Sequence, residues 1–329
     1  MNNQHEVSNE FSKVGMTFAV LTVFVTIIQF IFSYIFNMFF PIIIDNNNYN
    51  LIISTALLYI PAIPILYFGL RLPDDVKPTY QTKKMSIKSL LKFFCMTYFL
   101  LIASNIFGLF ITDFLSMIKG SMVENPVYTM FDGTNIVLMF ILSVILAPLF
   151  EEFFFRKMLI DRVVKYGERT SIILSGLVFG LFHGNLNQFM YAFVIGIFFG
   201  YVYIRTGKII YPIILHAMVN FMGSVASVLV VQGVDLNALP TDFTQIDELL
   251  AFFQTYGLGI IILLFYELAI FILVILGLVF FIQSCKKFYI ISRESDIPDS
   301  EAFRTVMFNK GMICYSIIWI IFIVIQILE

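Results

Sequence analysis

Nine apolar runs dominate this sequence, and their length limits what the chain can fold into more than any other feature. A helix needs about 20 apolar residues to cross the hydrocarbon core of a bilayer. The fifth run is short and the sixth follows it closely, so this pair is expected to form a tight helical hairpin or a partly re-entrant segment. We predict an all-α, polytopic transmembrane helical bundle with about eight or nine spans, at residues 14–43, 51–70, 92–118, 134–155, 171–184, 188–204, 209–231, 257–283 and 311–328.

The overall composition supports this prediction. The chain has 329 residues, of which 60% are hydrophobic and 13% are charged, whereas a soluble domain is about 45–50% apolar and about 25% charged. A soluble fold of this size leaves too much surface in water to hide so many apolar side chains. The expected surroundings are therefore membrane lipid, and we expect no nucleic-acid partner. The scattered cysteines, Cys95, Cys285 and Cys314, fit neither a disulfide framework nor a metal-binding spacing.

The distribution of basic residues predicts the orientation in the membrane. Cytoplasmic loops are enriched in Lys and Arg. If the N-terminus lies inside, every Lys and Arg except Lys119 falls in an inner segment, and the acidic outer loop 232–250 has none. The first apolar run is expected to be retained as a span, because it is much longer than the core of a signal peptide. The polar stretch 285–310 is expected to be a solvated inner connector.

Two adjacent carboxylates, Glu151 and Glu152, lie in the fourth run. Adjacent helical residues point about 100° apart, so the two side chains cannot have the same role. Arg156 lies four positions after Glu152, where an ion pair is natural, and this leaves Glu151 to face another group. Pro148 should free a backbone carbonyl near position 144, because proline has no N–H. Alternatively, the two acids only mark the end of the span, with Arg156 at the interface.

Two histidines also lie in apolar runs, His183 in the fifth and His216 in the seventh. Asn220 follows His216 by four positions, so both side chains lie on one helix face about 6 Å apart. Two hydrogen-bond donors fixed on a rigid helix can stabilise an oxyanion. The alternative is purely structural, because polar side chains in spans often form hydrogen bonds between helices.

These polar groups are expected at similar depths. With a rise of 1.5 Å per residue, Glu151, His216, Asn220 and His183 lie roughly 8, 10, 16 and 18 Å from the inner charges. Three helices can therefore bring them to one site that opens to the cytoplasmic side. Glycines at small-xxx-small spacing should allow the fifth and sixth runs to pack closely; they are Gly176, Gly180, Gly196 and Gly200.

The order of these motifs resembles the CPBP family of intramembrane proteases, also called the CAAX prenyl protease 2-like or Abi family. The resemblance covers about 134–225 and divides the chain into N-terminal helices (1–133), a catalytic core (134–225) and C-terminal helices (226–329). It is carried by three motifs, each within an expected span: Glu151-Glu152-xxx-Arg156, Phe179-xxx-His183 and His216-xxx-Asn220.

The resemblance implies a role for each site residue. Glu151 would be the base that activates water, and His183 would hold that water. His216 and Asn220 would stabilise the oxyanion, and the Glu152–Arg156 pair would support the site. We favour a glutamate-type site with no cofactor or metal. A Zn²⁺ site at Glu151, His183 and His216 remains open, since catalytic zinc often has three protein ligands, although no His-Glu-xx-His motif is present.

The expected function is that of an endopeptidase in the membrane, which cuts a membrane-associated or hydrophobic peptide or protein from the cytoplasmic side. The alternative is a non-catalytic scaffold of the same fold, such as a bacteriocin-immunity or regulatory protein. A transporter ranks third, because the two halves show no inverted repeat. A composition rich in Ile, Asn and Phe suggests an AT-rich genome and hence a bacterial cell membrane. The sequence gives no indication of the oligomeric state.

The predicted topology can be tested by labelling single cysteines introduced into a cysteine-free variant. In intact cells, a membrane-impermeant maleimide should label Asp242→Cys, in the acidic outer loop, and should not label Lys84→Cys, in a basic inner segment. Both should react after the membrane is permeabilised, which controls for accessibility. Labelling of Lys84→Cys in intact cells would contradict the orientation.

Overall fold

The computed structural model describes residues 2–40, 46–71, 78, 80, 82–123, 133–235, 238–240, 242, 244–293 and 296–328, apart from the side chains of residues 2–4. Within these ranges the chain forms helices and no β-strand. The α-helices are α1 Asn2–Phe39, α3 Asn47–Leu70, α4 Ile87–Lys119, α6 Ile136–Met139, α7 Ala147–Glu152, α8 Asp161–Val163, α9 Glu168–Phe182, α10 Leu186–Thr206, α11 Ile210–Asn220, α12 Ser227–Val231, α13 Ile246–Cys285, α14 Asp299–Met307 and α15 Lys310–Leu328. The chain also contains three π-helical segments, which are η1 Phe140–Leu146, η2 Phe153–Ile160 and η4 Phe221–Ala226. A 3₁₀ turn, η3, spans Val164–Tyr166.

Eight helices in the described part of the chain are long and apolar enough to cross a membrane. This confirms the all-α, polytopic bundle. The fifth run of the sequence is the exception, because α9 has only 15 residues and extends about 22 Å. It forms a hairpin with α10 and falls short of the hydrocarbon thickness of about 30 Å. The long helices are at 5–39, 47–70, 87–119, 136–166, 186–206, 210–231, 246–285 and 310–328.

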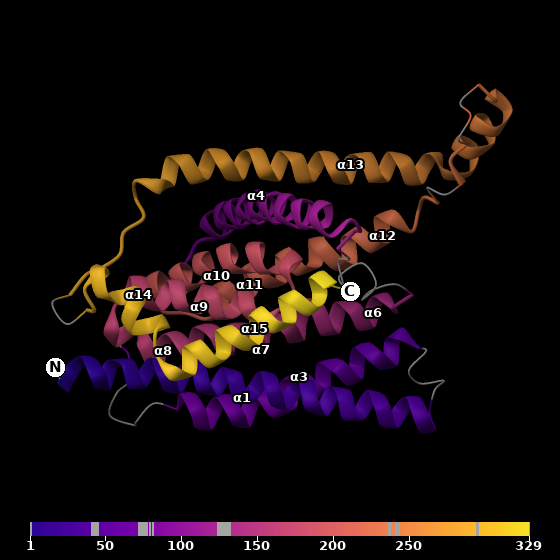
Figure 1. Ribbon diagram of the computed structural model, residues 1–329. Helices are drawn as coiled ribbons and strands as arrows, with labels where there is room; N and C mark the ends of the chain where they lie inside the picture. Colours follow the sequence, from indigo (N-terminus) through magenta and orange to yellow (C-terminus); the bar gives the residue numbers. More distant parts are fainter. Residues whose placement is uncertain are drawn as a thin grey trace.

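The central hairpin of α9 and α10 is surrounded by the other helices (Figure 1). Helix α10 packs against both α9 and α4, and α4 in turn packs against α13. Helix α13 lies on the outside of the bundle (Figure 1). On the other side, α1 packs against α3 and α15. The carboxylate motif lies at the junction of α7 and η2, and η2 contacts both α9 and α3.

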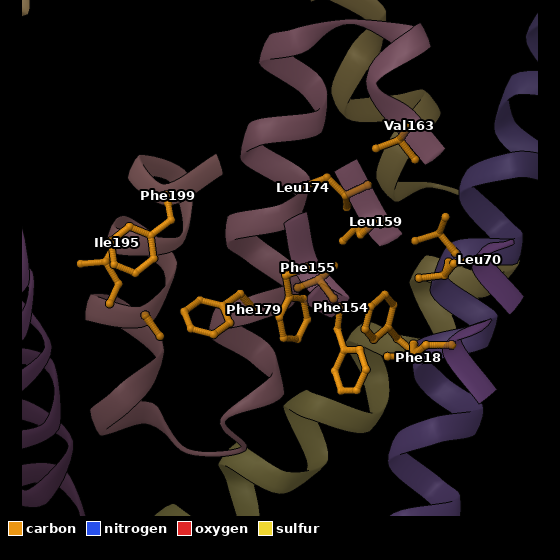
Figure 2. Close-up of a cluster of buried hydrophobic side chains, with 14 of the residues drawn as sticks. Phe18, Leu70, Phe154, Phe155, Leu159, Val163, Leu174, Phe179, Ile195 and Phe199 are labelled. Carbon is orange, nitrogen blue, oxygen red and sulfur yellow. The ribbon is translucent and has the colours of Figure 1, made fainter. Parts of the chain in front are cut away.

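Phenylalanines fill the space around this junction. Figure 2 shows Phe154 and Phe155 of η2 between Phe18 of α1 and Phe179 of α9. The Phe155 ring stacks on Phe18, with 5.7 Å between centroids, and meets Phe179 edge-on at 5.2 Å. Aromatic pairs in these geometries add about 0.5–1.5 kcal/mol each beyond burial. The core therefore fixes how η2 lies against α1 and α9.

Small residues allow the α9–α10 hairpin to close tightly. A Cβ atom at Gly196 would lie 2.9 Å from the Cα atom of Gly176, and one at Gly176 would lie 2.9 Å from the backbone nitrogen of Ile197. Both distances are shorter than a normal carbon contact of about 3.5 Å. The close packing predicted from the glycine spacing is therefore confirmed, and it holds α9 and its C-terminal turn against α10.

The connector at 285–310 is attached to the bundle by hydrogen bonds, although most of its described residues are exposed, as expected of a solvated connector. The backbone N–H of Ile291 donates to Glu168 Oε2 at 2.9 Å, and the N–H of Ile297 donates to the Tyr166 carbonyl at 3.1 Å. The connector also contains the short helix α14. Its composition looks like that of a loop, and the partners that order it are about 120–130 residues away in the chain.

The tight hairpin predicts a large difference between two identical substitutions. Gly176→Ala should lower stability by about 1–3 kcal/mol, the usual cost of overpacking, because the new Cβ meets backbone atoms. Gly257→Ala is the matched control, since a Cβ at this helical position meets nothing within 4 Å. Thermal unfolding in detergent measures both. Equal melting temperatures for the two variants would contradict the packing.

Candidate active site

The two carboxylates lie at the end of a short α-helix between two π-helical segments. Helix α7 ends at Glu152, η1 precedes it and η2 follows it. Wider π turns displace backbone groups from their usual α-helical partners and often occur at functional sites. Glu151 is only 9% exposed and Glu152 is completely buried. Each carboxylate therefore needs partners within the protein.

Glu152 is held between a cation and an imidazole. Its Oε2 atom lies 2.9 Å from Nε of Arg156, and both side chains are completely buried. Its Oε1 atom lies 2.9 Å from Nδ1 of His216. The ion pair expected from the i,i+4 spacing is thus present. Because a carboxylate oxygen accepts this hydrogen bond, Nδ1 of His216 carries the proton, and Nε2 is left to face the other acid.

Aromatic rings surround the Arg156 guanidinium. Its central carbon lies 4.7 Å from the ring centroid of Phe179 and 5.7 Å from that of Phe199. The same two rings also flank the His216 imidazole, each with 5.7 Å between centroids. Cation–π contacts in a desolvated place contribute about 2 kcal/mol or more. These contacts offset part of the cost of burying the cation. The same rings, Phe179 on α9 and Phe199 on α10, also hold His216 in place.

Glu151 faces in a different direction, toward α3 and α11. Its Oε1 atom accepts a hydrogen bond of 2.7 Å from the Tyr59 hydroxyl. Its Oε2 atom lies 3.8 Å from Nε2 of His216, which is longer than a direct hydrogen bond. The two acids therefore differ, as their adjacent positions on the helix require. Glu152 is committed to Arg156 and His216, while Glu151 has one oxygen anchored and the other oxygen opposite an imidazole nitrogen.

Asn220 is positioned by the proline of the carboxylate helix. The N–H of Ala147 donates to the Leu142 carbonyl, five residues back, so in this register the carbonyl that Pro148 leaves without a donor is that of Ser143. The Asn220 side chain supplies the missing donor, with Nδ2 at 2.8 Å from Ser143 O. The freed carbonyl predicted near 144 thus exists, and it is that of Ser143, because the turn is π-helical.

His183 lies at the C-terminal turn of α9, directly after its last helical residue. Its Nδ1 atom bonds to the Phe179 carbonyl at 2.9 Å, which leaves Nε2 for other contacts. The Phe179 ring lies 4.9 Å from the His183 ring and 5.7 Å from the His216 ring, between centroids, so this turn lies beside the same cluster. The structure thus gathers Glu151, Glu152, Arg156 and His216 by direct contacts, and His183 and Asn220 lie at the edge of this group.

Helix α15 holds the turn that follows His183. A Cβ atom at Gly184, whose φ is +74°, would lie 2.9 Å from the Trp319 ring. The Gln326 side chain accepts from the Leu186 N–H at 2.9 Å and donates to Asn187 Oδ1 at 2.8 Å. The depth of His183 is therefore fixed from outside the core motifs.

The contributions of Tyr59 and Ser143 to the site were not predicted from the sequence. Tyr59 is 92 positions from Glu151, and no spacing rule connects them. The available signal was a phenol inside an apolar span, since a buried Tyr hydroxyl usually finds a polar partner. Ser143 contributes its backbone carbonyl, and its hydroxyl pairs with that of Ser224 at 3.0 Å.

The side chains do not form a three-donor metal site. Across the described residues, no group of three or more His, Cys, Asp or Glu side chains is placed to hold a metal ion. Nδ1 of His216 and Nδ1 of His183 each bond to a protein oxygen, so only their Nε2 atoms could bind a metal. The donors considered for Zn²⁺, Glu151, His183 and His216, thus do not fit a zinc site in this arrangement.

Comparison with known proteins points to one family. Residues 133–222 match the family described as Type II CAAX prenyl endopeptidase Rce1-like. A protein of Bacillus subtilis (strain 168), described as "Putative membrane peptidase YdiL", is 34% identical over 87 residues, which cover 25% of this chain and 34% of that protein. The matched stretch thus spans about a third of this relative. No solved structure gives a match. Residues 133–222 carry the carboxylates and histidines of the cluster, whereas Tyr59 lies outside this segment. They are a CAAX prenyl endopeptidase Rce1-like domain of the CPBP family.

Proposed function

We propose that this protein is an intramembrane endopeptidase of the glutamate type. The observation that carries the proposal is the position of Glu151, whose Oε2 lies opposite His216 Nε2 while Oε1 is held by Tyr59. A carboxylate held in this way can accept a proton from water. The family match supports peptide-bond hydrolysis as the reaction.

The reaction begins with a water molecule between Glu151 and the His216 imidazole. A water oxygen about 2.8 Å from Glu151 Oε2 and from His216 Nε2 fits between these atoms, which are 3.8 Å apart. This water donates to Glu151 and accepts from His216 when the His216 ring carries both protons. Glu151 takes one proton of this water as the water oxygen attacks the carbonyl carbon of the substrate. The C–N bond of the tetrahedral intermediate then breaks, and Glu151 returns the proton to the departing amine. His183, whose Nε2 remains available, can accept the second hydrogen bond of the water.

The oxyanion that forms in this step needs donors. Asn220 uses one of its two amide hydrogens on Ser143 O, which leaves the second for the oxyanion. His216 donates through Nε2 only when its ring carries both protons. In that state the charges of Glu151, Glu152, Arg156 and His216 sum to zero, which favours burial of all four groups.

Glu152 and Arg156 act on the site through His216. The carboxylate fixes the tautomer and the direction of the imidazole, as outer carboxylates do for histidines in other active sites. Arg156 compensates the charge of Glu152 and is itself enclosed by aromatic rings. These two residues are therefore positioning residues, and Glu151, His183, His216 and Asn220 are the groups that contact the substrate or the water.

The substrate we propose is a membrane-associated or hydrophobic peptide that enters from the cytoplasmic side of a bacterial cell membrane. The N-terminus then lies in the cytoplasm, in agreement with the basic inner segments. The site is enclosed by apolar helices, so the bond to be cut must come from a chain that tolerates lipid surroundings. Glu151 is expected near the inner surface, where water can reach it.

Removal of the proposed base should abolish activity without unfolding the protein. We expect Glu151→Gln to lower kcat for cleavage of a membrane peptide by about 10²–10⁴-fold, the usual contribution of a general base, since the amide keeps the size of the side chain but accepts no proton. Glu267→Gln is the matched control, because Glu267 lies exposed on α13 outside the site. Full cleavage activity of Glu151→Gln at normal expression would contradict the role of Glu151 as the base.

Metal removal gives an independent test of the glutamate mechanism. We expect a strong chelator to leave the cleavage rate within about twofold, since the donor set does not fit a zinc site. Elemental analysis of the purified protein should find far less than one zinc per chain. Loss of activity on chelation, restored by added Zn²⁺, would contradict the proposal.

A further inference from the structure

We propose that Tyr59, which lies outside the family domain, is a positioning residue for the catalytic carboxylate. This inference rests on the proposed function and adds a part to it. Residues 133–222 hold the acids, the histidines and Asn220, but the hydrogen bond that fixes Glu151 comes from α3. The Rce1-like domain is then incomplete by itself, and α3 supplies a missing part of its active site.

The contact is buried and well formed. The Tyr59 hydroxyl donates to Glu151 Oε1 at 2.7 Å, and Tyr59 is 6% exposed although its neighbour Ile60 is 67% exposed. Hydrogen bonds to an ionised group contribute more than those between neutral groups, and their strength increases where water is absent. The hydroxyl therefore holds Oε1 and leaves Oε2 for the proton transfer.

The Tyr59 ring is itself held in place by residues of the carboxylate helix. It stacks on Phe150, with 4.9 Å between centroids and 22° between planes, and lies 6.3 Å from Phe154. These two phenylalanines precede Glu151 by one position and follow it by three. The segment that carries the acid thus also aligns the phenol that binds the acid.

A second contact fixes the register of α3 against the carboxylate segment. At the far end of α3, the side chain of Asn48 accepts from the Asn135 N–H at 2.7 Å, and Asn135 caps the start of α6. Helix α3 is therefore attached to the α6–η2 segment at its first turn and again at Tyr59. Two attachments on one helix determine the depth at which the hydroxyl lies.

The hydrogen bond should also fix the orientation of the base. The hydroxyl holds Oε1, so Oε2 keeps its place opposite His216 Nε2. If the donor is removed, the carboxylate can turn away from the water, and the chemical step slows while the substrate still binds. A residue with a packing role only would leave kcat per folded molecule unchanged.

Tyr59→Phe tests this role, because it keeps the ring and its stacking on Phe150. We expect kcat to fall by about 10- to 100-fold, as for loss of a hydrogen bond to a charged group, with KM within about twofold. Tyr67→Phe on the same helix is the control; Tyr67 is 48% exposed and should show no change.

Two further variants make every outcome decisive. Tyr59→Leu removes both ring and hydroxyl. If the hydroxyl is what matters, it should lower kcat at least as much as Tyr59→Phe does. A wild-type kcat for Tyr59→Phe, together with an inactive Glu151→Gln, would overturn the role of Tyr59 and leave the proposed function intact. An active Glu151→Gln would instead remove the proposed function itself.

Discussion

The completely buried ion pair of Glu152 and Arg156 is the constraint on which the rest of the site depends. Two charges out of contact with water are costly to bury, and each gains from further partners. The second oxygen of Glu152 is therefore committed to His216, and the guanidinium is enclosed by Phe179 and Phe199. These contacts bring η2, α9, α10 and α11 to one point. The positions of Glu151 and His216 relative to each other follow from this arrangement.

Backbone hydrogen bonding explains the second part of the site. Pro148 leaves one carbonyl of the carboxylate segment without a main-chain donor, and side chains from neighbouring helices donate to carbonyls of this segment. Asn220 donates to Ser143 O, and the Ser175 hydroxyl donates to Phe155 O at 2.9 Å. Each of these bonds joins a helix to the carboxylate segment. In a membrane such bonds are especially restrictive, because lipid offers no alternative partner.

The sequence was enough to predict features that depend on local spacing. The bundle follows from the apolar runs, the Glu152–Arg156 pair from its four-residue separation, and the hairpin packing from its glycines. Features set by contacts between distant segments could not be predicted. The hydroxyl of Tyr59 gave no indication of its partner, and α-helical spacing did not show the π-helical turns on either side of Glu151 and Glu152. The docked connector also depends on distant partners such as Glu168.

The central claim is that Glu151 activates a water molecule and does not attack the peptide bond itself. A single turnover in ¹⁸O-labelled water, with a peptide that the wild-type protein cleaves, tests this claim directly. The account predicts that the new carboxyl terminus of the first product carries one ¹⁸O atom and that Glu151 stays unlabelled. An unlabelled first product, with ¹⁸O found afterwards in Glu151, would show a covalent intermediate and contradict the account.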